Sequence, residues 1–351
     1  MCQNNSMKFI KFLFAIIFFL SSAFIHAQQS QEITAGEKIV LKKRGVYSCG
    51  KQPKQVIFSP DSKYIIFPLL DDSGFDVFSV DENKFIKRVA CPTPKNKGFA
   101  EGLFIPEKSV FLVSQMTTAS LHEFSYPDFE FIRTIPTNGT WSKFIVYSPE
   151  KNILAVSNWL SNDISIIDYD TGNLIRKIDT KAAPRGLYFI SGGEKIISLA
   201  FDGGEIELFE VETAKRLEHI AIKKSCMRHV VVDEGQTFAY VSDMYNRTIY
   251  KINLSLFKIV AELKVFNNPN TIDLLDNCLF VSCRGPNSTN VYTDRSPVNG
   301  RIFLIDCATF EPLIDFAGGN QPTGLDVSPD NSLLCFSNFQ DANMELYEIS
   351  R

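Results

Sequence analysis

The stretch that decides the fold is Gly324-Leu-Asp-Val-Ser-Pro-Asp-Asn-Ser-Leu-Leu-Cys-Phe-Ser-Asn338, an apolar run, a Ser-Pro turn and a second apolar run that closes on a serine. The same arrangement recurs along the chain, and the first runs of the seven copies are residues 56–60, 102–106, 145–149, 187–192, 230–234, 272–276 and 325–329. The second runs close on Ser114, Ser157, Ser198, Ser242, Ser282 and Ser337, with Pro68 in the first copy. Internal repetition at this period is typical of a repeat architecture.

Two further runs complete each copy, one that alternates in period two, as in residues 163–169, and a shorter one, as in 174–178. Four short strands in about 42 residues is the size of a propeller blade. The seventh copy ends after its third run, at 344–349, whereas an orphan run, 38–44, precedes the first copy. We therefore predict an all-β fold, a seven-bladed β-propeller with four antiparallel strands per blade. The N-terminal strand would complete the last blade, because an open ring exposes pairing edges.

Residues 148–158, Ser-Pro-Glu-Lys-Asn-Ile-Leu-Ala-Val-Ser-Asn, and residues 324–338 resemble the YVTN-repeat propellers of exported bacterial proteins. Residues 164–168, followed by Thr171-Gly172, fit the same repeat, and the resemblance extends over residues 36–351. It implies the propeller fold, whereas the function stays open, because that family and its lactonase-like relatives include enzymes, binding proteins and surface proteins. The chain departs from the repeat at Ile105-Pro106, Asp233-Glu234 and Leu275-Asp276, which replace Ser-Pro.

The first 27 residues have the pattern of a secretory signal peptide. Lys8 and Lys11 precede an apolar run, 12–24, and Ala27 offers a cleavage point before Gln28. That run is shorter than the roughly 20 residues that a membrane-spanning helix needs. We expect residues 1–27 to be removed and residues 28–351 to form one propeller domain outside the cytoplasm, periplasmic or secreted. No stable membrane insertion is expected after cleavage.

Composition narrows the classes of partner. The 351 residues are 45% hydrophobic and 22% charged, with a formal net charge of −4. These values exclude a disordered chain and provide no basic field for nucleic acid, so we expect no nucleic-acid partner. Seven cysteines follow the leader, an odd number, so at least one thiol is free or pairs between chains. The candidate disulfides are Cys226–Cys283 and Cys49–Cys91, each between adjacent blades.

In such a ring the innermost strand of each blade begins at one mouth of the central channel. Aligning the copies on the Ser-Pro turn gives seven residues at this opening position: Lys54, Ala100, Lys143, Arg185, Arg228, Asn270 and Thr323. Four are cationic in a chain of negative net charge, and converging like charges favour an anion between them. We predict a site for a carboxylate, phosphate or sulfate, clamped by Arg185 and Arg228. In the alternative, these side chains extend outward or pair with Glu101 and Asp243.

The residues that follow each second strand form the rest of the rim. They comprise polar residues and large apolar ones, namely Asn158, Asp243, Arg284 and Asn338 together with Met116, Trp159, Phe201, Met244 and Phe339. This mixture suits a ligand with a polar head and a flat or apolar body. Alternatively, Trp159 and Phe339 pack beneath neighbouring loops. The sixth copy carries a long insertion, 284–300, which we expect on the same face as a binding element or lid, or as surface decoration.

Catalytic and metal motifs are sparse. The sequence lacks a nucleophile elbow, a zinc-protease helix motif and a phosphate-binding loop. Cys226-Met-Arg-His229 offers only two of the three or four ligands of a zinc site. We expect no metal, no cofactor and no catalytic residue.

The residues at the mouth of the channel lead to two functional hypotheses. The first is a binding or scaffold protein that holds an anionic small molecule, or an acidic segment of a protein partner, among the cations and His229. The second is a lactonase-like hydrolase in which Arg185 and Arg228 stabilise an oxyanion while His229 or Asp243 activates water.

Overall fold

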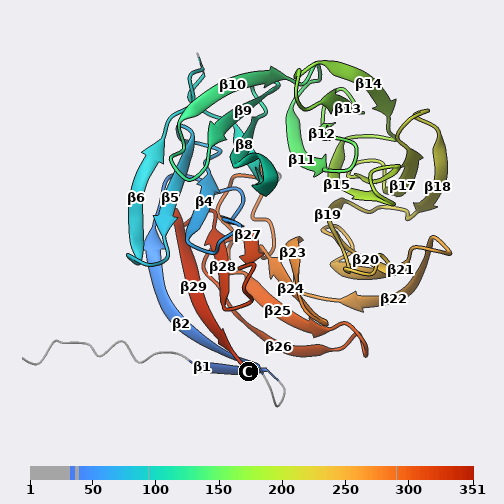
Figure 1. The fold of residues 1–351 in the computed structure, drawn as a ribbon. Helices are drawn as coiled ribbons and strands as arrows, with labels where there is room; N and C mark the ends of the chain where they lie inside the picture. The colour runs from blue at the N-terminus through green and yellow to red at the C-terminus, as the bar shows by residue number, and fades with distance from the viewer. Residues whose placement is uncertain (1–31, 36–38, 94, 290) are drawn as a thin grey trace, which may run out of the picture.

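The computed structural model describes residues 32–35, 39–93, 95–289 and 291–351, and the expected leader, residues 1–27, lies outside them. These residues form seven antiparallel sheets that stand around a central channel (Figure 1). The predicted seven-bladed, all-β ring is therefore confirmed. Among the described residues the only helical element is a short 3-10 turn, η1 (Pro106–Lys108), at the place where Ile105-Pro106 replaces Ser-Pro.

Six blades follow the chain in order, each with four strands. The first three blades contain β3 (Ile57–Phe58), β4 (Tyr64–Pro68), β5 (Phe75–Ser79) and β6 (Lys84–Val89); β7 (Phe99–Ile105), β8 (Val110–Gln115), β9 (Ser120–Ser125) and β10 (Phe131–Pro136); and β11 (Ser142–Ser148), β12 (Ile153–Asn158), β13 (Asp163–Asp168) and β14 (Leu174–Asp179). The next three contain β15 (Pro184–Ile190), β16 (Lys195–Ala200), β17 (Glu205–Glu210) and β18 (Arg216–Ala221); β19 (Met227–Val232), β20 (Phe238–Asp243), β21 (Thr248–Asn253) and β22 (Lys258–Lys264); and β23 (Pro269–Leu275), β24 (Cys278–Cys283), β25 (Arg301–Asp306) and β26 (Pro312–Ala317).

The seventh blade joins the two ends of the described chain. Its strand order is β27 (Pro322–Val327), β28 (Leu333–Asn338), β29 (Asn343–Ser350), β2 (Ile39–Ser48) and β1 (Glu32–Ala35). The N-terminal strand pairs with the C-terminal one, with Leu41 opposite Ile349, as the orphan strand predicted. The fifth strand, β1, was not predicted; it covers the outer edge of β2 and buries Ile33, which protects an edge that would otherwise be free to pair.

The core lies between neighbouring blades, because each sheet buries both faces of its inner strands against the next sheet. Between the first two blades, the rings of Phe75, Phe111 and Phe124 pack edge to face, with ring centroids 5.1 Å apart around Phe75. Burying one such side chain stabilises the fold by about 1.5–3 kcal/mol. The outer strands are partly exposed, and several of them carry charged residues on their exposed face.

The first strands of successive blades contact one another and line the channel. In all blades but the first, this strand has a register shift near its start, as between Pro184 and Leu187 of β15. A bulge of this kind re-aims the residues it contains. The opening positions predicted from the sequence, such as Arg185, fall in these bulges, which explains why consecutive residues there can both face the channel.

Four of the six serines that close a second run, Ser157, Ser242, Ser282 and Ser337, donate a hydrogen bond to the following blade and so fix its position. Ser157 donates a hydrogen bond to the carbonyl oxygen of Arg185 (3.0 Å), and Ser242 donates one to the carbonyl oxygen of Asn270 (2.7 Å). Ser337 closes the ring by donating to the carbonyl oxygen of Pro53 (3.1 Å), next to Lys54. The same hydroxyls accept bulge N–H groups of their own blades. The recurring serines therefore hold the opening residues at fixed places around the mouth.

The seven cysteines after the leader are all free thiols in the structure, so neither of the two disulfides considered from the sequence is formed. Cys91, Cys283 and Cys335 are buried within the apolar packing. In the part of the chain that the structure covers, no helix has the length and hydropathy needed to cross a membrane.

Candidate functional site

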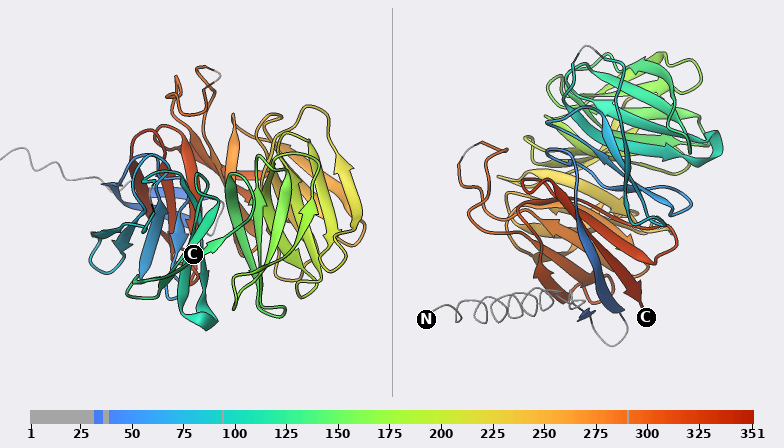
Figure 2. Two further views of the ribbon diagram at one scale, coloured as in Figure 1. Left: turned by 90° about the horizontal axis from the view of Figure 1, so that it is seen from above. Right: turned by 90° about the vertical axis from the view of Figure 1, so that its left-hand side faces the viewer.

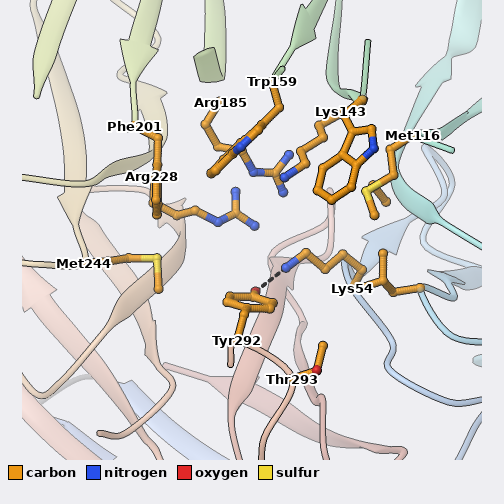
Figure 3. A pocket seen from close by; sticks show the side chains of 13 residues that line it. Lys54, Met116, Lys143, Trp159, Arg185, Phe201, Arg228, Met244, Tyr292 and Thr293 are labelled. Atoms are coloured by element: carbon orange, nitrogen blue, oxygen red, sulfur yellow. Dashed lines mark hydrogen bonds between the residues drawn. The ribbon is translucent and has the colours of Figure 1, made fainter. Parts of the chain in front are cut away.

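A cavity of about 400 Å³ occupies the mouth of the channel (Figure 3), a size typical of small-molecule sites. Four cations from four different blades face it, namely Lys54, Lys143, Arg185 and Arg228. The other residues that line it are largely apolar: Leu70, Ala100, Met116, Trp141, Trp159, Phe201, Met244, Tyr292 and Thr293. The cavity thus brings together five of the seven opening residues and, of the residues after the second strands, Met116, Trp159, Phe201 and Met244. The other predicted site residues, Asn158, His229, Asp243, Asn270, Arg284, Thr323 and Asn338, are not among those that line it.

Aromatic rings surround the two lysines. The Nζ of Lys143 lies 3.5 Å from the ring centroid of Trp159 and 5.6 Å from that of Trp141. The ring of Trp159 also packs against Phe201, with centroids 4.7 Å apart. On the opposite side, the Nζ of Lys54 donates a hydrogen bond to the hydroxyl of Tyr292 and lies 4.4 Å from the centre of its ring. The cavity therefore has cationic points set in flat apolar walls.

The insertion at 284–300 emerges on this face, as expected, and projects beyond the ring (Figure 2). Arg284 anchors it, because its guanidinium stacks 3.7 Å from the centre of the Tyr292 ring and donates to Gln321 (2.5 Å). Arg295 forms an ion pair with Asp341 of the seventh blade (2.6 Å). These contacts hold Tyr292 over the cavity.

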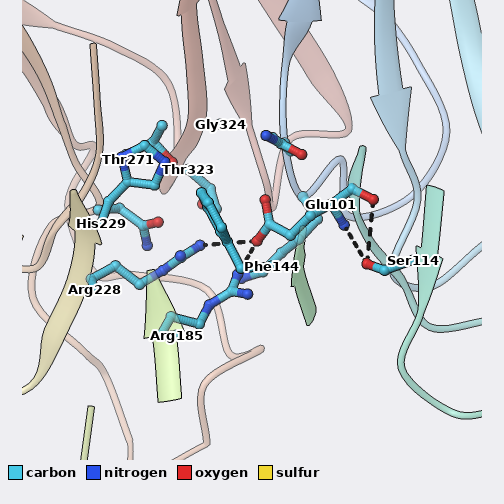
Figure 4. A network of polar contacts seen from close by, with 12 residues as sticks. Glu101, Ser114, Phe144, Arg185, Arg228, His229, Thr271, Thr323 and Gly324 are labelled. Atoms are coloured by element: carbon cyan, nitrogen blue, oxygen red, sulfur yellow. Dashed lines mark hydrogen bonds and ion pairs between the residues drawn. The ribbon is translucent and has the colours of Figure 1, made fainter. Parts of the chain in front are cut away.

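A second layer of channel residues lies directly after the opening residues in sequence (Figure 4). Its only carboxylate among the described residues is Glu101, which forms an ion pair with Arg185 and lies 3.6 Å from Arg228. All three side chains are buried. The sequence alternative in which these arginines pair with Glu101 thus holds for both Arg185 and Arg228. One carboxylate balances only part of the charge of four cations.

Buried polar atoms without a partner cluster at this site. In the described chain, seven buried side-chain nitrogen or oxygen atoms make no hydrogen bond, and six belong to channel residues: Nη1 of Arg185, Nη1 of Arg228, Nδ1 of His229, Nδ2 and Oδ1 of Asn270, and Nε of Arg284. The seventh is Oγ of Ser198. Buried polar groups in proteins are nearly always paired with protein or with ordered water, so these six atoms are available to hydrogen-bond water or a bound molecule.

The cations of the cavity shift one another's pKa values. Burial and the positive charges of Arg228, Arg284 and Arg185 hold the pKa of Lys54 well below its usual range. Burial and the charges of Arg185, Lys54 and Arg228 do the same for the pKa of Lys143. Perturbation of this kind is typical of functional sites.

The same surroundings lower the pKa values of His229 and Arg228. Burial lowers the pKa of Arg228 to about 10. Burial, Arg228 and Arg185 lower the pKa of His229 to about 3, so its imidazole is uncharged near neutral pH.

Asn270 and Thr323 complete the opening ring as fully buried residues. Thr323 donates to the carbonyl oxygen of Gln321 (2.9 Å). Three other predicted site residues lie within hydrogen-bond networks of their own blades. Asn158 donates to Asp163 (2.6 Å), Asn338 donates to Glu345 (3.0 Å), and Asp243 accepts from backbone N–H groups of its turn.

Trp141, Tyr292 and Gln321 were missed by the sequence reasoning. Trp141 and Gln321 lie two residues before an opening position, where left-handed backbone recurs at Gln52, Trp141, Ala183, Asn268 and Gln321. Extending the alignment of the copies by two residues would have found them. Tyr292 belongs to the insertion, which has no counterpart in the other copies.

No family model matches the chain. The chain is 35% identical over 327 residues to antigen Lp49 of Leptospira interrogans, and the alignment covers 88% of this chain and 71% of Lp49. The chain belongs to the family of Lp49. Among solved structures, hydrazine synthase of Kuenenia stuttgartiensis superimposes with a TM-score of 0.72 at 16% identity, over 85% of this chain and 95% of that one. This likeness concerns the fold alone.

Proposed function

We propose that this Lp49-family propeller binds a small anionic molecule with a flat apolar body in the cavity at the channel mouth. The observation that carries the proposal is the meeting of four cationic side chains, three of them buried and Lys143 half-buried, with a single carboxylate, Glu101, among the described residues. Nη1 of Arg185 and Nη1 of Arg228 have no partner in the described chain, and a carboxylate or phosphate oxygen would satisfy them. The rings of Trp141, Trp159 and Phe201 supply flat walls for the body of the ligand.

The enclosure of the cavity favours a small molecule over an acidic protein segment. Tyr292 covers part of the mouth through its hydrogen bond with Lys54, and Arg284 holds the ring in place. A protein segment would have to displace this loop to reach the arginines.

The protein acts outside the cytoplasm in this proposal. The leader pattern of residues 1–27 and the resemblance to exported YVTN-repeat propellers support export. The relative Lp49 is described as an antigen, which agrees with exposure outside the cell.

The same site is poorly suited to the lactonase-like alternative. A general base works best when its pKa lies near the working pH, whereas the pKa of His229 is about 3. Asp243 accepts hydrogen bonds from Cys226, Tyr245 and Asn246. Neither group is poised to activate water, which favours binding over hydrolysis.

Intrinsic fluorescence tests the proposal, because both tryptophans of the chain line the cavity. We expect benzoate, used as a probe, to change the emission saturably, and Arg228→Met to weaken its binding about 10- to 100-fold, the loss of one charge-assisted contact. The variant Arg176→Met serves as the control, because Arg176 lies on the outer strand β14 and does not line the cavity, and it should leave binding unchanged. Equal binding by both variants would contradict the proposal.

A further inference from the structure

Lys143 differs from the other cations of the cavity in having no polar partner. Its Nζ makes no hydrogen bond and no ion pair within the described residues, whereas Lys54 donates to Tyr292 and Arg185 pairs with Glu101. The amine lies beside the faces of Trp159 and Trp141 and opens into the cavity (Figure 3). A bound molecule could reach the amine without breaking a hydrogen bond or an ion pair.

Two opposing effects decide the charge of this amine. The faces of the two tryptophan rings favour the ammonium form of the Lys143 amine. Burial and the neighbouring cations Arg185, Lys54 and Arg228 favour the free amine, and their combined effect holds the pKa well below the usual value for lysine. Desolvation and an adjacent cation are the conditions that make a lysine amine nucleophilic toward carbonyl groups.

By binding the carboxylate of a molecule, Arg185 and Arg228 would also fix the position of a carbonyl group on that molecule relative to the Lys143 amine. Nη1 of Arg185 and Nη1 of Arg228 are unpartnered donors for an anionic group, and both side chains line the same cavity as Lys143. A flat molecule that rests between the aromatic walls with its carboxylate on the arginines would lie in the same cavity as the amine of Lys143.

Building on the proposed function, we infer that Lys143 captures aldehydes or ketones that also carry a carboxylate, as a reversible imine. The nitrogen of Lys143 adds to the carbonyl carbon and gives a carbinolamine. The carbonyl oxygen then leaves as water together with the two amine hydrogens, and a C=N bond remains. No oxidant or reductant is needed, and hydrolysis returns the free amine and the carbonyl compound.

The test uses 4-formylbenzoate, which has a carboxylate and an aldehyde on one ring, and sodium cyanoborohydride, which reduces the imine to a stable secondary amine. Intact mass and peptide mapping of the treated chain locate the label. We expect one label on Lys143, formed at least about tenfold faster than with benzaldehyde, which lacks the carboxylate, since about 1.4 kcal/mol of anion binding gives that factor. Lys143→Met should abolish this label, whereas Lys151→Met, at an exposed turn, should leave it unchanged.

Benzoate binding, measured by fluorescence on the same samples, separates this inference from the proposed function. Benzoate binding without a label on Lys143 would overturn the imine and leave the anion site intact. Labelling that spreads over surface lysines, or that is as fast with benzaldehyde, would also overturn it. Should Lys143→Met fail to fold, peptide mapping of the unmodified sequence still decides, because it reports which lysine carries the label.

Discussion

Glu101 of the second blade forms a buried ion pair with Arg185 of the fourth blade, across the mouth of the channel and 84 residues apart in sequence. Arg228 of the fifth blade lies 3.6 Å from the same carboxylate. This one acid joins three blades and offsets part of the repulsion among the cations. The geometry makes Glu101 a structural counterion and leaves Nη1 of both arginines without a partner among the described residues.

Replacement of that carboxylate is expected to destabilise the ring. Glu101→Gln leaves Arg185 and Arg228 buried without a counterion, and breaking a buried pair in this way costs about 3–5 kcal/mol. Thermal unfolding should show a lowered Tm for Glu101→Gln and an unchanged Tm for Glu107→Gln, whose side chain is exposed. Benzoate should raise the Tm of Glu101→Gln more than that of the unaltered chain, because it restores a negative charge. Equal Tm values for the two variants would show that the pair is dispensable.

Anion binding is expected to strengthen as the pH falls. In the empty site, burial and neighbouring cations lower the pKa of Lys54 and that of Lys143, and a bound anion favours their ammonium forms. The bound state then holds more protons, so the affinity for benzoate should rise from about pH 9 to about pH 6, while benzoate stays ionised. Fluorescence titrations across this range measure the slope, and the double variant Lys54→Met, Lys143→Met should flatten it. A steeper dependence of benzoate affinity on pH in the double variant would show that Lys54 and Lys143 do not cause this dependence.

Lys54 and Lys143 should also make the free energy of unfolding of the ligand-free chain depend on pH, in the direction opposite to their effect on benzoate affinity. Their folded-state pKa lies below the unfolded-state value of about 10.4, so the unfolded chain binds more protons between the two values and stability rises with pH in that window. Urea unfolding of the chain without ligand should therefore show a larger free energy of unfolding toward high pH. The double variant should lose this part of the pH dependence.

The serine contacts between blades provide a matched pair of variants. Ser242 accepts a hydrogen bond from the N–H of His229 (3.1 Å) and donates to the carbonyl oxygen of Asn270 (2.7 Å). Ser198 occupies the equivalent position in the fourth blade, and its hydroxyl has no partner in the described chain. Ser242→Ala should cost about 1–3 kcal/mol, whereas Ser198→Ala should be nearly neutral. Chemical denaturation measures both, and equal losses would contradict the role of the serines.

Closure by the N-terminal strand can be tested at Leu41. This side chain is fully buried on β2 opposite Ile349, so Leu41→Ala should cost about 2–5 kcal/mol. The neighbouring Lys42 is exposed, and Lys42→Ala should leave the free energy of unfolding nearly unchanged. A loss no larger for Leu41→Ala than for Lys42→Ala would mean that β2 contributes little to the ring.

The ring and its closure could be predicted because every blade repeats the same apolar pattern and the two ends of the chain hold complementary parts of one blade. The opening ring of cations could also be predicted, since its members share one position in the repeat. The fifth strand β1 could not, because a short run such as residues 32–35 has no period of its own. The sequence analysis named Glu101 as one possible partner of the cations, but the choice between pairing and an outward orientation required the structure, because Glu101 approaches Arg185 across the channel rather than along the repeat.

Asp243 is a residue whose contacts in the structure could not be predicted from the repeat. Its place after a second strand predicted a rim position, yet nearby N–H groups draw its carboxylate into the turn. Local hydrogen bonds of this kind depend on the conformation of the turn, which the pattern of apolar runs does not specify.

A crystal structure with bound 4-bromobenzoate tests the central claim most directly, because the anomalous signal of bromine fixes both the position and the direction of the probe. We predict one strong bromine site among Trp141, Trp159 and Phe201, with the carboxylate on the unpartnered nitrogens of Arg185 and Arg228. Bromine found only at surface sites, with the cavity free of the probe at saturating concentration, would contradict an anion site at the channel mouth.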